Sequence, residues 1–137
     1  TGSGVLAIAA SRLGAVRVVA IDLDEDALTS ARENLELNGA TDLVEVRTLD
    51  LTTESGLLTT PFDVITANLT GAMLMRYVDV LVGWLKRPGQ LIVSGFQAHE
   101  AADVSQAFEG AGLVVAARED EDTWVALRIA MTSPGAE

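Results

Sequence analysis

Two glycines near the beginning of the sequence, Gly2 and Gly4, have a type and spacing that could serve chemistry. Glycines that open a helix let the backbone turn tightly and let a ligand approach where a Cβ atom would otherwise stand. The free N–H groups of a first helical turn favour a nearby anion, so a carboxylate and a pyrophosphate both suit this turn. A plain strand–helix turn without a ligand has the same pattern.

Asp22 lies 18 residues after Gly4, at the end of an apolar, β-branched segment. A carboxylate at a strand end can accept hydrogen bonds from ribose hydroxyls, and it repels a 2′-phosphate. The glycine turn and Asp22 together therefore predict a nucleoside with free ribose hydroxyls. They do not separate NAD from S-adenosylmethionine, and a solvated aspartate at a strand end is the alternative.

Three further residues follow predicted strands. Asp50 can accept a hydrogen bond from an adenine amino group, and the backbone N–H of Leu51 can then donate to the ring; an ordinary loop aspartate fits Asp50 equally well. Asn68 is a neutral amide that can accept a hydrogen bond from an amine nucleophile without adding charge. An aspartate there would keep the amine protonated and unreactive. The alternative for Asn68 is a cap on the following helix.

Composition excludes several other kinds of chemistry. Twenty acidic and nine basic residues give a net charge of −11, which disfavours a nucleic-acid backbone as the main partner and suits a basic partner or a small molecule. The absence of Cys excludes disulfides and thiol catalysis, and the single histidine, His99, excludes a multi-His metal site. No apolar run reaches the length of a membrane span and no signal peptide is visible, which predicts a soluble cytoplasmic domain without a metal.

Alternating patterns of strand and helix must position these residues. Helices are predicted over Val5–Leu13, Asp24–Asn38, Gly71–Leu85 and His99–Ala111, and strands over Val16–Ile21, Leu43–Thr48, Phe62–Ala67, Gln90–Ser94, Leu113–Arg118 and Thr123–Ala130. Apolar residues at helical spacing predict one buried face on each of the last three helices: Ala27, Leu28, Ala31 and Leu35; Leu74, Val78, Leu81 and Leu85; and Val104, Phe108 and Ala111. Such alternation is typical of an α/β fold with a doubly wound, mostly parallel sheet. The short acidic connection Glu119–Asp122 forces the last two strands to pair antiparallel. Pro88-Gly89 predicts a turn.

The opening residues indicate a fragment. Glycine-rich turns of this kind normally follow a buried strand, so the start at Thr1 predicts a chain cut inside the motif, with its first strand and any recruiting domain upstream. One domain is expected over residues 1–130, followed by a tail over 131–137. Tyr77, Trp84 and Trp124 are expected to pack in the core, although Trp124 opens the last strand and could instead line the mouth of a pocket.

Five stretches resemble the bacterial ribosomal protein L11 methyltransferase family over nearly the whole chain, from Thr1 to about Ile129. They are TGSGVLAIAASRLGA, VVAIDLDEDALTSARENLELNGA, DVITANLTG, LIVSGF and DTWVAL. The resemblance implies a Rossmann-like, class I S-adenosylmethionine-dependent methyltransferase fold with an antiparallel last strand. It also implies methylation of lysine and N-terminal amino groups of a large-subunit ribosomal protein, which a separate N-terminal domain recruits.

The same resemblance implies roles for individual residues. Thr1, Gly2 and Gly4 match the cofactor loop, Asp22 the ribose-binding acid, Asp50 the adenine side, and Asn68 the mouth of the active site. Leu69-Thr70 replaces the Pro-Pro-aromatic tail that follows this Asn in many amino-methylating enzymes, which argues against planar bases as nucleophiles.

The expected mechanism is orientation of a neutral amine, by Asn68 and nearby carbonyls, in line with a carbon–sulfur bond that is already electrophilic. Orientation alone can be worth about 7–11 kcal/mol of barrier. The acidic surface suits a basic client. The alternatives are another class I methyltransferase acting on RNA or a small molecule, an NAD-dependent oxidoreductase, and a non-catalytic binding module. Gly2-x-Gly4-x-x-Ala7 fits the oxidoreductase, but the closing hairpin argues against it.

Overall fold

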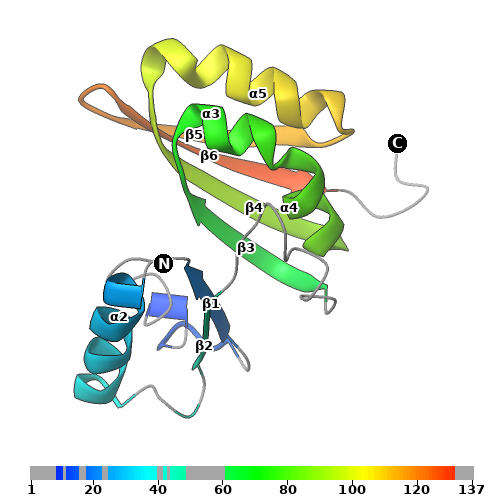
Figure 1. The fold of residues 1–137 in the computed structure, drawn as a ribbon. Helices are drawn as coiled ribbons and strands as arrows, with labels where there is room; N and C mark the ends of the chain where they lie inside the picture. Colours follow the sequence, from blue (N-terminus) through cyan, green and yellow to red (C-terminus); the bar gives the residue numbers. More distant parts are fainter. Residues whose placement is uncertain are drawn as a thin grey trace. The chain divides into compact units, whose positions relative to one another are not determined.

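The chain folds into two compact units, Thr1–Gly56 and Leu57–Glu137, each with its own sheet (Figure 1). A computed structural model describes residues 9–10, 12–15, 18–22, 25–39, 42, 44–48 and 61–131. None of the helices within these ranges has the length and apolar character that a membrane span requires.

The first unit contains a strand–helix–strand motif. Strand β1 (Val18–Asp22) pairs parallel with β2 (Val44–Thr48), and helix α2 (Glu25–Leu37) makes the crossover between them. The predicted apolar stripe of α2 is confirmed, because Leu28, Ala31 and Leu35 are buried at helical spacing. These elements agree with the sequence prediction to within a few residues at each end.

The second unit holds a four-stranded sheet in the order β3-β4-β6-β5. Its strands are β3 (Phe62–Asn68), β4 (Leu85–Gln97), β5 (Val114–Glu121) and β6 (Trp124–Met131). Strands β3 and β4 pair parallel, whereas β6 pairs antiparallel with both β4 and β5. Only β6 therefore runs against its neighbours in this sheet, which confirms the predicted antiparallel C-terminal strand of a Rossmann-like α/β fold.

Three helices lie on one face of this sheet (Figure 1). They are α3 (Gly71–Arg76), α4 (Val78–Trp84) and α5 (Ala101–Gly110), with a short 3₁₀ turn, η2 (Ala98–Glu100), before α5. The core beneath them includes side chains that are no more than 1% exposed: Leu74, Leu91, Val93, Phe96, Val104, Phe108, Leu127 and Ile129. Tyr77 and Trp84 are also buried, as predicted, whereas His99 is exposed.

The single helix predicted over residues 71–85 is wrong. Tyr77 has non-helical backbone angles (φ −104°, ψ 17°) and separates α3 from α4. Leu85 is extended (φ −91°, ψ 134°) because it pairs with Phe62 of β3. The predicted buried face is nevertheless confirmed, since Leu74, Val78, Leu81 and Leu85 are all buried.

Two predicted turns lie inside strands instead. Strand β4 begins at Leu85, so Pro88-Gly89 belongs to it; residues 86–89 lie opposite Asp63 alone, because the pairing slips between Phe62 and Val64. The acidic run belongs mostly to β5, because residues 119–121 pair with 126–124 of β6 and leave Asp122-Thr123 as the turn. Strand β6 ends at Met131, one residue beyond the predicted end of the domain.

Candidate functional site

Asn68 ends β3 at the carboxyl edge of the sheet. It lies opposite Ser94 of β4 in the parallel register, and the N–H of Leu69 donates to the Ser94 carbonyl at 2.9 Å, which extends the pairing past Asn68. The Asn68 side chain is exposed, and its oxygen Oδ1 lies against Gly95. Ligands of open α/β sheets bind outside the carboxyl ends of strands, so Asn68 has the position that the sequence predicted.

The helix cap that was the alternative for Asn68 is a different residue. Thr70 is the N-cap of α3, and its hydroxyl Oγ1 accepts a hydrogen bond from the N–H of Met73 at 3.3 Å. Among the described residues, none donates to or accepts from the Asn68 carboxamide. This amide is therefore not used to satisfy the backbone at the start of the helix, and it can bind another group.

A groove of about 850 Å³ opens at this edge of the sheet. Its lining comes from the ends of three strands and the beginning of β6, which reaches the same edge because it runs antiparallel. The lining residues are Asn68, Ser94, Gly95, Glu119, Asp120, Glu121, Trp124, Val125 and Ala126. The groove therefore joins the predicted catalytic amide to the acidic run, although the two lie some 50 residues apart in the sequence.

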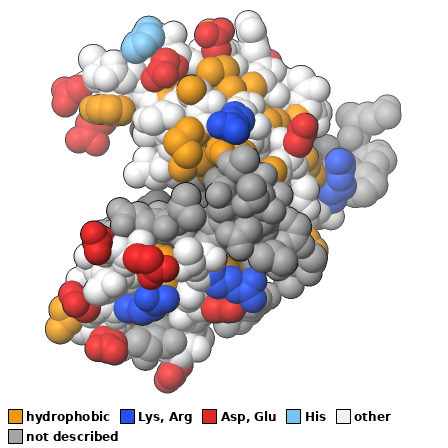
Figure 2. Space-filling view, viewed as in Figure 1, with side chains coloured by type: hydrophobic (Ala, Val, Ile, Leu, Met, Phe, Trp, Pro, Cys, Tyr) orange, Lys and Arg blue, Asp and Glu red, His pale blue; other side chains and the backbone are white. Residues whose placement is uncertain are grey.

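Trp124 is the largest apolar side chain that lines this groove, and 52% of it is exposed. It is paired on one side with Gln97 of β4 and on the other with Glu121 of β5. The turn beside it is anchored, because the Thr123 carbonyl accepts from the N–H of Ala98 at 2.8 Å. Figure 2 shows apolar and acidic side chains gathered at this end of the hairpin. The expectation that Trp124 packs in the core is therefore wrong, and the alternative, that it lines the mouth of a pocket, is confirmed.

The three acidic residues of the groove have different electrostatic surroundings. The Arg118 guanidinium makes two hydrogen bonds to the Asp120 carboxylate, at 2.7 and 2.9 Å. These hydrogen bonds raise the pKa of Arg118 and lower the pKa of Asp120, and the opposite charges add to both shifts. Glu119 and Glu121 alternate with this pair along β5, on the face that also carries Trp124. Two carboxylates therefore stand next to an exposed indole ring.

The remaining predicted site residues lie elsewhere. Asp22 ends β1 in the first unit, but its side chain is not among those that the structure describes. Thr1, Gly2, Gly4, Asp50 and Leu51 lie outside the described residues. Asp22 and Asn68 belong to different units, so a shared cleft between them stays a prediction.

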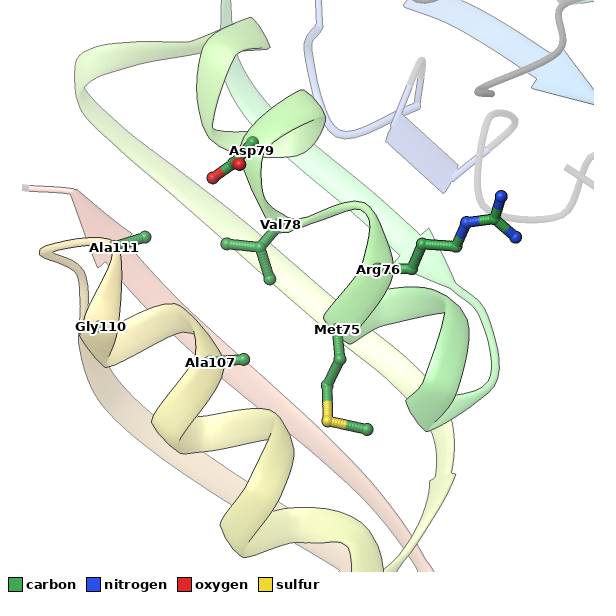
Figure 3. A pocket seen from close by; sticks show the side chains of 7 residues that line it. All are labelled: Met75, Arg76, Val78, Asp79, Ala107, Gly110 and Ala111. Atoms are coloured by element: carbon green, nitrogen blue, oxygen red, sulfur yellow. The ribbon is translucent and has the colours of Figure 1, made fainter. Parts of the chain in front are cut away.

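A smaller hollow of about 230 Å³ lies on the helical side of the sheet (Figure 3). Met75 and Val78 point across it toward Ala107 of α5, whereas the Arg76 side chain points away. The Arg76 guanidinium is 5.5 Å from the centre of the Tyr77 ring, a cation–π distance. Because this hollow is a gap between packed helices and lies away from the strand ends, we place the functional site in the larger groove.

Comparison with known proteins identifies the family. The model of the family described as ribosomal protein L11 methyltransferase (PrmA) matches residues 1–132. The chain belongs to this family. It is 39% identical over 128 residues to the ribosomal protein L11 methyltransferase of Desulfitobacterium hafniense, and 42% identical over 127 residues to that of Pelobacter propionicus. Each match covers 93% of this chain but 40% of the relative, so the chain spans less than half the length of these curated relatives.

Solved structures give the same result. The ribosomal protein L11 methylase of Lactobacillus delbrueckii subsp. bulgaricus is 30% identical with a TM-score of 0.87, over 95% of this chain and 65% of that one. An RNA methyltransferase of Salinibacter ruber, in complex with S-adenosyl-L-homocysteine, is 23% identical with a TM-score of 0.75, over 99% and 79%. The second likeness shows the fold alone, and both agree with a class I methyltransferase sheet.

Sequence reasoning missed two parts of the groove. It interpreted Glu119–Asp122 as a turn, although three of these residues lie in β5. Ser94 and Gly95 were noted only within the stretch LIVSGF of the family resemblance, and no physical role was assigned to them. The signal that could have been used is a glycine directly after one predicted strand, at the edge where the neighbouring strand ends in a polar residue. Such a glycine indicates a close approach of the two strands.

Proposed function

We propose that residues 1–130 are the catalytic domain of an S-adenosylmethionine-dependent methyltransferase that methylates amino groups of a basic ribosomal protein. The observation that carries the proposal is the exposed Asn68 carboxamide at the mouth of an acidic, Trp-lined groove, in a chain of this family. The curated relatives are named for ribosomal protein L11, and the Salinibacter ruber neighbour binds S-adenosyl-L-homocysteine.

The described strands fit the proposed cofactor residues. Asp22 pairs with Thr48, so β1 and β2 end together at one edge of their sheet, and Asp50 follows Thr48 by two residues in the sequence. We assign the ribose to Asp22, the adenine side to Asp50 and Leu51, and the amino-acid end to the loop that contains Thr1, Gly2 and Gly4. A carboxylate suits ribose hydroxyls as a hydrogen-bond acceptor.

Asn68 is the proposed catalytic residue, and it also borders the cofactor. When bound, S-adenosylmethionine supplies an electrophilic methyl group, so the protein need not supply a nucleophile. Once solvent or a nearby carboxylate has taken the proton of the incoming ammonium group, the Asn68 oxygen accepts a hydrogen bond from the neutral amine and thereby aims the nitrogen lone pair. Because the amide is neutral, it does not favour the protonated, unreactive form of the amine. Orientation of the amine is then the main contribution of this chain to the rate.

The groove supports a cationic substrate segment. Glu119 and Glu121 stand beside the exposed Trp124, and carboxylates together with an indole face attract a lysine or arginine side chain. The chain as a whole carries a net charge of −11, which accelerates encounter with a basic protein at low salt. A lysine that enters past Trp124 meets Asn68 within the same groove.

The proposal is tested by methyl transfer in the full-length enzyme. With labelled S-adenosylmethionine and ribosomal protein L11, we expect label in the protein, and calorimetry should detect S-adenosylmethionine but not NAD. Asn68→Ala should lower kcat on the order of 10²-fold and leave cofactor affinity in place, while the exposed Gln106→Ala serves as the control. Label in RNA and not in protein, or full turnover of Asn68→Ala, contradicts the proposal.

The cationic substrate is tested separately by charge. Glu119→Gln/Glu121→Gln should raise KM for the ribosomal protein and flatten its dependence on salt, with kcat changed little. Glu33→Gln/Glu109→Gln removes the same net charge from exposed helix positions outside the groove and is the matched control. Equal effects of the two double variants would mean that net charge alone attracts the substrate.

A further inference from the structure

A β-bulge lies directly beside Asn68. In the pairing of β4 with β6, Val93 lies opposite Leu127 and Phe96 lies opposite Val125, so Ser94 and Gly95 together face Ala126. Gly95 has φ +95°, a conformation that side chains rarely adopt. Bulges next to functional sites often re-aim a neighbouring side chain. Phe96, the residue directly after the bulge, is fully buried and anchors β4 there.

The bulge leaves no space for a side chain at position 95. A Cβ atom on Gly95 would collide with the Asn68 oxygen Oδ1, and it would lie 2.7 Å from the Leu69 carbonyl oxygen and 3.1 Å from the Leu69 nitrogen. Two of these three neighbours are backbone atoms of Leu69, whose N–H is held by its hydrogen bond to the Ser94 carbonyl. The backbone of Leu69 therefore cannot yield as the end of a flexible side chain could.

We propose that Gly95 is a positioning residue for Asn68. The bare Cα of Gly95 provides the surface against which the Asn68 carboxamide lies, and this contact sets the direction of Oδ1 into the groove. The inference rests on the catalytic role proposed for Asn68. It assigns the glycine of Ser94-Gly95-Phe96 a role in orientation of the amine, in addition to its role in the turn of the chain.

Two glycine variants separate collision from backbone strain. Gly112 has φ +93°, almost the same as Gly95, but a Cβ atom there would meet nothing within 4 Å. Both Gly95→Ala and Gly112→Ala should lower Tm through strain. In the full-length enzyme, only Gly95→Ala should lower kcat, on the order of 10²-fold for a misplacement near 1 Å, with KM for cofactor and substrate nearly unchanged. Equal kcat in the two variants, measured well below Tm, overturns the proposal.

A double variant tests whether Gly95 acts through Asn68. If it does, Gly95→Ala should cost little further kcat in an Asn68→Ala background, because the oxygen that it displaces is gone. Independent, multiplicative losses would overturn the positioning role. Should Gly95→Ala fail to fold because of its collision with the Leu69 backbone, Asn68→Gln tests the contact instead. This variant keeps the amide but moves its oxygen off Gly95, so kcat should fall, whereas a wild-type kcat in Asn68→Gln overturns the positioning role.

The same variants distinguish this inference from the proposed function. An Asn68→Ala enzyme with unchanged kcat contradicts the catalytic role of Asn68, and the positioning role of Gly95 then fails with it. An Asn68→Ala enzyme that is slow, beside a Gly95→Ala enzyme as active as Gly112→Ala, contradicts the positioning role alone.

Discussion

The middle and the carboxyl edge of the four-stranded sheet belong to the same strands but differ sharply. In the middle, Leu91, Val93, Leu127 and Ile129 are at most 1% exposed, and their pairing is regular. A few residues along, Ser94-Gly95 forms a bulge and Trp124 is 52% exposed. The regular pairing buries apolar surface and stabilises the fold, whereas the irregular pairing exposes polar and aromatic groups for a ligand.

This difference shows that the site depends on the core without sharing its composition. Phe96 illustrates the dependence, because it is fully buried although it follows the bulge directly. Substitutions in the middle of the sheet should therefore change stability, and those at the edge should change kinetics. At the edge, a bulge interrupts the regular strand pairing and a large aromatic ring is exposed. Such departures from regular strand structure are expected at functional sites.

The largest effect is expected in the core. Phe108 of α5 is completely buried, so Phe108→Ala should destabilise the fold by about 3–5 kcal/mol through lost burial and a cavity. Denaturant unfolding of the full-length enzyme measures this loss. The kcat of the molecules that remain folded should be close to that of the wild type. A loss of kcat without a loss of stability would show that α5 serves the site directly.

A charge at position 68 should change the pH dependence of turnover. An aspartate near the amine favours the protonated amine and raises its pKa by about one unit or more. Asn68→Asp should therefore be slow at neutral pH, and its pH–rate profile should rise at higher pH than that of the wild type. Asn68→Ala lacks the charge and is the control. A profile of Asn68→Asp that coincides with the wild type contradicts contact between residue 68 and the amine.

Trp124 should have a smaller effect, confined to substrate binding. Its ring is half exposed, so the loss of a cation–π contact should raise KM for the basic substrate about two- to fivefold in Trp124→Ala. Trp124→Phe should keep part of this affinity. Exposed Trp124 contributes little to the core, so a strong fall in Tm would instead make it a structural residue.

The smallest effect concerns the exposed Arg118–Asp120 pair. The pKa of Asp120 is lowered below its usual 3.8, so its contribution to stability is present at neutral pH and is lost as pH falls through that lowered pKa. Asp120→Asn should thus lower Tm slightly at pH 7, and the difference from the wild type should vanish in strong acid. A difference that grows in acid would contradict this pairing.

Local patterns in the sequence predicted most elements of the fold. Buried faces at helical spacing identified α2 and α5, and β-branched runs identified β1 and β3, because burial of one face imposes its period on the chain. The break at Tyr77 and the early start of β4 were missed. The early start of β4 depends on the pairing of Leu85 with Phe62, a contact between residues distant in the sequence.

For the site, the sequence by itself determined the chemistry of single residues: a neutral amide at Asn68 after a strand, and an excess of negative charge. Only the tertiary structure decided which of them meet. The antiparallel return of β6 brings Trp124 and the acidic end of β5 to the edge where Asn68 lies, and the bulge at Gly95 sets that amide in place. Strand order and register are long-range properties, and no local pattern of side chains specifies them.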